Sequence, residues 1–205
     1  MGTETHRKRC KKCKAQISLL LQASFGQGEA IKRLDISTLL SSYMDYSCYA
    51  ALEKIYTALQ RYRGHENFVR SKKLKEVDFF VPSPGFILEF DERQHFTIPR
   101  KIALSLYPDD IKIDFDKKLW MKLCEELHEK DNDPEFRDEQ RAWYDTLRDF
   151  APYILPELHL MPTKRILDAD LKIKGVAIEN YFEWCNFDPL SSDDVNKFSQ
   201  LIAKK

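Results

Sequence analysis

The sequence predicts a single mixed α/β domain, in which a mixed central β-sheet is flanked by helices and preceded by an N-terminal helical extension. The chain has 205 residues, of which 43% are hydrophobic and 12% aromatic, and this is enough to bury one core. Near its middle, two short apolar segments rich in Val, Ile and Phe are typical of strands. Before and after them, apolar residues recur at the three- and four-residue spacing of amphipathic helices. Strands set between such helices predict a sheet covered by helical layers.

The N-terminal part of the chain differs in character from the rest. Residues 1–45 are predicted to form a basic tail and a helical extension, in which Leu and Ile are spaced for one or two helices interrupted near Gly26. Residues 46–205 are predicted to form the α/β domain. Its first helix is expected over residues 47–62, with Gly64 as its stop, because large apolar residues recur there at helical intervals.

A β-hairpin is expected after this helix. Residues 76–81 (EVDFFV) and 86–91 (FILEFD) have the composition of two strands, and the Pro-Ser-Pro-Gly sequence between them favours a turn. The remaining elements follow from helical periodicity, helix-start signals and one further apolar segment. We expect helices over residues 117–129, 134–150, 176–184 and 192–203, and a strand over residues 158–166 that returns beside the hairpin.

The hairpin gathers acidic side chains on one face. If Val81 pairs with Phe86 across the turn, the antiparallel register places Asp78 opposite Glu89. Side chains two residues apart on a strand point the same way, so Asp91 shares the face of Glu89. Like charges placed this close destabilise a sheet unless something compensates them.

A divalent cation is the compensation that we expect. Carboxylate oxygens are hard ligands that suit Mg²⁺ or Mn²⁺, and these ions keep several waters and accept phosphate oxygens. Such an ion activates a water and polarises a phosphoryl group, which is the chemistry of phosphodiester hydrolysis. The alternative is an exposed acidic face on an ordinary hairpin.

The residues around the acids resemble a known family. A helix bearing Glu53 precedes Asp78 on one strand, and the next strand continues as Glu89-x-Asp91-x-x-Gln94-His95. This pattern resembles the PD-(D/E)XK restriction-endonuclease-like superfamily, most closely the small endonucleases of the very-short-patch-repair type. The resemblance extends over residues 47–167 and implies a restriction-endonuclease-like fold with Mg²⁺-dependent endonuclease activity, directed at DNA.

The resemblance also implies roles for individual residues. Asp78 would be the principal metal ligand and Glu89 the second acid of the motif. Asp91 stands where the wider superfamily usually has its lysine, a position that the short-patch group also fills with Asp. By the same likeness, Gln94 and His95 would position the site and activate or orient the attacking water. Glu53 would support the metal from outside its direct ligands or bind a second ion.

The chain also departs from the pattern of this family. Glu92 occupies the place of the usual glycine, and position 91 lacks the lysine of the wider superfamily. An alternative therefore stays open, in which the same fold serves as a catalytically inactive module that binds nucleic acid or another protein. A third possibility is an ordinary scaffold whose acids are incidental.

Charge is distributed unevenly along a chain that is neutral overall. Lys and Arg outnumber Asp and Glu by 15 to 6 in residues 1–75, and Asp and Glu outnumber Lys and Arg by 27 to 18 in residues 76–205. The basic residues directly before the hairpin can contact nucleic-acid phosphates, although a solubilising loop would have the same composition. These candidate nucleic-acid-binding residues are Arg70, Lys72, Lys73 and Lys75.

Cysteine usage and hydropathy indicate an intracellular, cytoplasmic protein without a membrane partner. The five cysteines form no regular disulfide framework, which favours a reducing compartment. Cys10 and Cys13 have the spacing of half a zinc site, but no second pair lies nearby, so zinc is not expected there. No apolar run approaches the ~20 residues that a membrane span needs.

Overall fold

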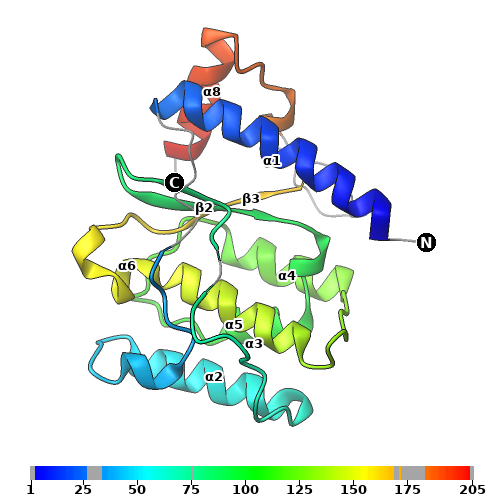
Figure 1. Cartoon of the computed structure of the whole chain (residues 1–205), viewed down its shortest axis with the longest axis vertical. Helices are drawn as coiled ribbons and strands as arrows, with labels where there is room; N and C mark the ends of the chain where they lie inside the picture. Colours follow the sequence, from blue (N-terminus) through cyan, green and yellow to red (C-terminus); the bar gives the residue numbers. More distant parts are fainter. Residues whose placement is uncertain (1–2, 27–33, 75, 169–170, 172–182, 204–205) are drawn as a thin grey trace.

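The structure is a computed structural model of the chain, and it describes residues 3–26, 34–74, 76–168, 171 and 183–203 (Figure 1). The predicted helix over residues 176–184 falls mostly outside these ranges. Its described end belongs to the 3-10 helix η4 (Glu183–Asn186). None of the helices in the described ranges combines the length and the apolar character that a membrane crossing requires.

A three-stranded sheet lies at the centre of the fold. Its strands are β1 (Phe79–Val81), β2 (Phe86–Asp91) and β3 (Lys164–Leu167), in the order β1-β2-β3. β1 and β2 are antiparallel with Val81 opposite Phe86, which confirms the predicted hairpin and its register over residues 79–81. The first strand is shorter than the expected 76–81 and begins at Phe79, so Asp78 lies directly before it. β3 runs parallel to β2, which makes the sheet mixed, as expected.

The third strand begins later than the sequence indicated. The expected strand over residues 158–166 is preceded by the 3-10 helix η3 (Pro156–Leu158) and by His159, whose φ is +47°. A left-handed residue cannot continue an extended strand, so pairing with β2 starts only at Lys164.

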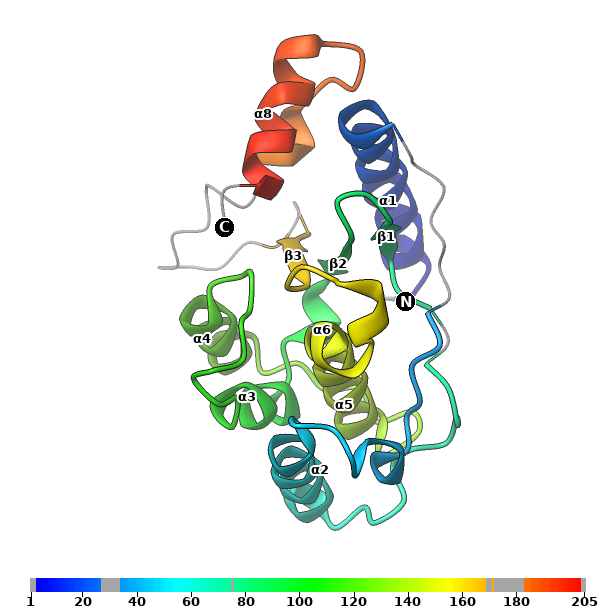
Figure 2. The same cartoon turned by 90° about the vertical axis from the view of Figure 1, so that its left-hand side faces the viewer.

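Helices α3 (Ile98–Ser105), α4 (Lys117–Leu127), α5 (Arg137–Asp149) and α6 (Ala151–Ile154) cover one face of the sheet (Figures 1 and 2). They connect β2 to β3, because two parallel strands need a long crossover. Side chains that accept hydrogen bonds from backbone N–H groups begin two of them, with Thr97 capping α3 and Asp116 capping α4. Helix α2 (Tyr49–Arg63) packs on α3 and α5, away from the sheet, and ends at Gly64 with φ +76°.

Helices α1 (Thr3–Phe25) and α8 (Ser192–Ala203) cover the opposite face of the sheet (Figure 2). The sequence places α1 in an extension, but its side chains Ile17, Leu20 and Leu21 are buried in a core shared with the strands and α8. The first helix therefore belongs, with α8, to one of the two helical layers that cover the sheet. Helix α8 has the predicted bounds.

The alternation of side chains along the strands decides where the acids point. Leu88 and Phe90 of β2 belong to the core under α1 and α8, whereas Ile87 belongs to the core on the side of α5. Glu89 and Asp91 therefore face α5, as does Arg165 of β3. All three are buried. Glu89 and Asp91 thus lie between the sheet and the crossover helices.

Candidate active site

Asp78 and Glu89 are fixed opposite each other by the hairpin backbone. Asp78 Oδ2 accepts a hydrogen bond of 3.0 Å from the backbone N–H of Phe90, and Glu89 Oε1 accepts one of 3.0 Å from that of Asp78. The second oxygen of each carboxylate faces a cation. Lys14 Nζ of α1 lies 2.5 Å from Asp78 Oδ1, and Arg148 Nε of α5 lies 3.3 Å from Glu89 Oε2. Each acid therefore has one oxygen held by the backbone and one turned toward positive charge.

The surroundings of Glu89 favour its protonated form. The pKa of Glu89 is raised to about 7, because the effects of burial and of the nearby Asp78, which both raise it, outweigh the charge of Arg148, which lowers it. Arg148 responds in the complementary way: burial lowers its pKa, but Glu89 and Asp145 outweigh this effect and raise it. Glu89 is therefore a carboxyl group that changes charge near neutral pH, where the arrival of a further cation would ionise it.

Asp91 lies deeper than the pair. Its side chain is 1% exposed, with Oδ2 accepting from Trp120 Nε1 at 2.6 Å and Oδ1 accepting from Arg165 Nη1 at 2.6 Å. It shares the face of Glu89, as predicted, but both of its oxygens are engaged by the fold. The expected place of Asp91 among the catalytic acids is not supported by these contacts, and we assign it a structural role.

The ion pairs around Asp91 continue along the interior. Arg165 has a side chain that is 0% exposed, and its Nε lies 2.8 Å from Asp149 Oδ1. Arg100 Nη2 reaches the other oxygen of Asp149 at 2.7 Å. Burial alone would lower the pKa of Arg165, but Asp149, Asp91 and Asp145 raise it well above its ordinary value. Arg165 therefore stays charged and compensates buried carboxylates from a strand and a helix.

His95 is bound to an acid that the sequence analysis did not select. The 3-10 helix η2 (Arg93–His95) turns the chain back after β2, which brings His95 Nδ1 within 3.0 Å of Asp145 Oδ2. Burial lowers the pKa of His95, but the charge and hydrogen bond of Asp145 outweigh it, so the net pKa is raised. Asp145 also pairs with Arg148 at 3.3 Å. His95 and Glu89 are thereby linked through two residues of α5.

A sequence signal for Asp145 and Asp149 does exist. Asp138, Ala142, Asp145 and Asp149 are spaced by four, three and four residues, which places them on one stripe of α5, and all four are buried. Acids on the buried stripe of an amphipathic helix require internal cations. Two ion pairs form within this helix, with Arg141 to Asp138 at 3.8 Å and Arg148 to Asp145 at 3.3 Å.

Two of the predicted site residues have other surroundings. Gln94 donates from its side chain to Glu92 Oε2 at 2.9 Å, and its backbone carbonyl accepts from Arg141. Glu53 is exposed on α2, where the hydroxyl of Tyr49 donates to it at 3.0 Å. Because α3 and α5 separate α2 from the sheet, the structure does not bring Glu53 to the hairpin (Figure 1).

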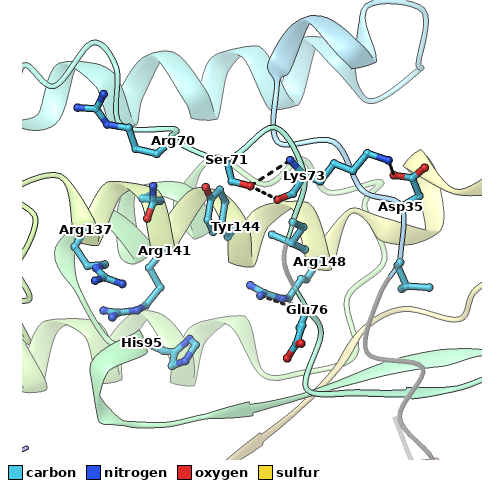
Figure 3. A pocket seen from close by; sticks show the side chains of 13 residues that line it. Asp35, Arg70, Ser71, Lys73, Glu76, His95, Arg137, Arg141, Tyr144 and Arg148 are labelled. Carbon is cyan, nitrogen blue, oxygen red and sulfur yellow. Dashed lines mark hydrogen bonds and ion pairs between the residues drawn. The ribbon is translucent and has the colours of Figure 1, made fainter.

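An open cavity of about 1350 Å³ lies between α5 and the segment that leads into the hairpin (Figure 3). The predicted nucleic-acid-binding residues Arg70 and Lys73 line it from that segment, Lys72 is exposed beside them, and Lys75 is outside the described residues. Its lining holds five Lys or Arg side chains and two acids. The lining residues are Leu34, Asp35, Arg70, Ser71, Lys73, Leu74, Glu76, His95, Arg137, Gln140, Arg141, Tyr144 and Arg148.

Arg148 joins this cavity to the acid pair. It lines the cavity and at the same time lies 3.3 Å from Glu89 Oε2. His95 lines the cavity as well, with Nδ1 committed to Asp145, so Nε2 is the nitrogen available to a ligand. The cavity thus holds positive charge and an imidazole, and Arg148 connects it to Glu89 of the carboxylate pair.

The carboxylates of the hairpin could contribute to an open magnesium site but not to a closed one. In the described part of the chain, no three His, Cys, Asp or Glu side chains gather into a group that could hold a metal ion. Mg²⁺, however, is commonly held by one or two carboxylates, with water and substrate phosphate supplying the other ligands. Asp78 Oδ1 and Glu89 Oε2 are two such oxygens, and each already faces a cation.

Comparison of the chain with protein-family models, with curated proteins and with solved structures found no match. The fold and the site define the class of the protein as mixed α/β, with a pair of opposed carboxylates beside a basic cavity. The likeness to restriction-endonuclease-like proteins rests on the sequence pattern alone. Its function is therefore proposed below from the geometry of the site.

Proposed function

We propose that this chain is a metal-dependent nuclease, with a restriction-endonuclease-like fold, that hydrolyses phosphodiester bonds in DNA. The observation that carries the proposal is that Arg148, which lines a cavity rich in Lys and Arg, also lies 3.3 Å from Oε2 of Glu89, the partner of Asp78 in the acid pair. Acids of this kind suit a divalent ion, and cations of this kind suit phosphates. Hydrolysis of a phosphodiester by this chemistry uses a divalent ion and phosphate-binding cations at the same site.

The residues of the chain have distinct roles in this proposal. Asp78 and Glu89 would hold Mg²⁺ or Mn²⁺, which when bound lowers the pKa of a water and polarises the phosphoryl group. Arg148 would then turn from Glu89 to a phosphate oxygen. Lys14, whose side chain is 36% exposed, would leave Asp78 in the same way. His95, whose pKa Asp145 raises and whose protonated form it thereby favours, would donate a proton from Nε2 to the leaving oxygen.

A second candidate function is a nucleic-acid-binding module without catalysis. The observation that favours it is the neutralisation of the acid pair within the fold, since Lys14 and Arg148 already stand where a metal ion would be needed. In this case the cavity would bind phosphates and the acids would only stabilise the hairpin.

Cleavage assays on the full chain separate the two candidates. We expect plasmid and linear DNA to be cut in the presence of Mg²⁺ or Mn²⁺ and to remain intact with EDTA. DNA binding without cleavage under all metal conditions would select the binding module. A protein that neither binds nor cleaves DNA would contradict both candidates.

Metal binding is expected to depend on pH through Glu89. Because its pKa is raised to about 7, the carboxyl group carries a proton below that pH and is charged above it. A proton on the ligand competes with the ion, so the affinity for Mn²⁺ should rise about tenfold per pH unit up to pH 7 and then level off. Calorimetric titration with Mn²⁺ alone, in steps across this range, measures the profile.

The matched control is Glu89→Gln, which keeps an oxygen for the N–H of Asp78 but has no proton to lose. This variant should bind Mn²⁺ more weakly, with an affinity that hardly changes across neutral pH. A wild-type profile that is as flat as that of the variant would contradict the assignment of Glu89 as a ligand.

A further inference from the structure

We infer that the nucleic acid taken by this site is single-stranded, and that the cavity beside α5 is the trough in which the strand lies. The name "α5 trough" refers to the cavity lined by the residues given above, from Leu34 to Arg148. The inference rests on the proposed function for the chemistry at the acid pair. It adds the class of substrate, which three features of the trough support.

The first feature is a row of cations along one helix. Arg137, Arg141 and Arg148 are four and seven residues apart, so they share one face of α5 and project into the trough (Figure 3). With a rise of about 1.5 Å per residue, the row is about 16 Å long. One strand of nucleic acid carries a phosphate every ~3.4 Å along a duplex axis, and a row of this length therefore follows several phosphates of a single strand.

The second feature is that part of this charge is not paired with acids. Arg137 donates from Nε to the backbone carbonyl of Asp133 at 3.1 Å, and the guanidinium of Arg70 lies 4.7 Å from the ring centre of Phe136. In the portion of the chain that the structure describes, neither guanidinium lies within ion-pair distance of a carboxylate, although the charge of Arg137 helps to lower the pKa of Asp131. Both are therefore available to phosphates without breaking a salt bridge.

The third feature is an aromatic ring within the row of cations. Tyr144 falls on the same face of α5, between Arg141 and Arg148, and lines the trough half-buried (Figure 3). Burial raises the pKa of its phenol, and hydrogen bonds from the backbone at Ser71 and Arg70 lower it. These hydrogen bonds connect the ring to the segment on the other side of the trough. Sites for single strands combine a basic groove with aromatic side chains on which bases stack.

The shape of the trough argues against a duplex. Proteins usually read double-stranded DNA by inserting a convex element into the major groove, which is about 12 Å wide. The α5 trough is concave and has a volume of about 1350 Å³. Helix α5 forms one of its walls, and the segment around Ser71 forms the other. Cavities of about 300–1000 Å³ enclose single small ligands. The trough therefore has room for a few nucleotides of one strand.

The experiment measures binding without cleavage. The full chain carrying Asp78→Asn is titrated, in EDTA, into a fluorescent single-stranded DNA, its duplex, and RNA of the same sequence. We expect the single-stranded DNA to bind at least about tenfold more tightly than the duplex. We also expect log K to fall with log salt with a slope of about −2 or steeper, because each phosphate contact contributes about −0.7 on single strands. Equal or tighter binding of the duplex would overturn the inference. RNA bound as tightly as the DNA strand supports it and widens the substrate class.

Variants locate the strand. Arg137→Glu and Arg70→Glu should each weaken single-strand binding about tenfold, whereas Lys54→Glu, an equal charge change on the exposed side of α2, should have no effect. Tyr144→Leu should weaken binding while leaving the salt slope unchanged, because it removes stacking and no charge. Losses in Arg137→Glu and Arg70→Glu no larger than in Lys54→Glu would place the nucleic acid elsewhere and overturn the inference.

Different experimental results would contradict the inference and the proposed function. Preferential single-strand binding by a protein that cuts no DNA with Mg²⁺ or Mn²⁺ would overturn the nuclease and support the trough. Metal-dependent cutting of duplex DNA by a protein without single-strand preference would support the nuclease and overturn the trough.

Discussion

Replacing Arg165 by Met is expected to lower the free energy of unfolding by about 3–5 kcal/mol, the loss that typically follows when one partner of a buried ion pair is removed. The side chain is 0% exposed and is bonded to Asp91 and Asp149, so its removal leaves Asp91 without its arginine and Asp149 with Arg100 as its remaining arginine. Urea denaturation of the wild type and of Arg165→Met at neutral pH measures the difference.

Lys197→Met is the matched control for this prediction. Lys197 forms an i,i+3 ion pair of 3.2 Å with Asp194 on the surface of α8, with a side chain that is 63% exposed. Water and salt screen such a pair, so its loss should leave the unfolding midpoint unchanged. If Arg165→Met were as harmless as this control, Asp91 and Asp149 would have other sources of compensation, and the assigned role of Arg165 would be wrong.

Asp78→Asn is expected to slow metal-dependent DNA cleavage by a factor on the order of a thousand, while the unfolding midpoint changes little. The amide oxygen of Asn can still accept the hydrogen bond from the N–H of Phe90, so the hairpin is preserved. What disappears is the negative charge beside Lys14 and Glu89 that would hold the ion. Single-turnover cleavage rates at saturating Mg²⁺ and a parallel thermal melt measure the two effects.

Glu53→Gln tests whether this loss is specific to the site. It makes the same chemical change on an exposed acid of α2, which the structure separates from the hairpin, so cleavage should proceed at the wild-type rate. A loss of activity in Glu53→Gln would instead restore the role that the family resemblance gave to this residue. Cleavage at the wild-type rate by Asp78→Asn would remove Asp78 from the mechanism.

The parts of the fold that could be predicted are those that local sequence determines. The Pro-Ser-Pro-Gly turn lies directly between two strongly β-forming segments, so the register that opposes Asp78 and Glu89 follows from neighbours in the chain. Helix α8 was likewise predictable within its observed bounds from its own periodicity. Such features need no knowledge of what packs against them.

The parts that could not be predicted depend on contacts between distant segments. The engagement of Asp91 by Trp120 and Arg165 requires α4 and β3 to be placed over the end of β2. The pairing of His95 with Asp145 spans 50 residues of sequence. The spacing of apolar residues in the sequence also does not predict on which side of α5 the helix bearing Glu53 lies. Strand and helix patterns show which face of an element is buried, but not which partner buries it.

The packing of α1 against α8 has a consequence for how the protein is made. These two helices share one core over the sheet, yet one precedes and the other follows every other described element. During synthesis, the apolar side of α1 stays only partly covered until α8 has left the ribosome, because α8 follows all three strands in the chain. Closing such a long loop is slow, and a newly made molecule therefore depends on shielding of this helix against aggregation until α8 arrives.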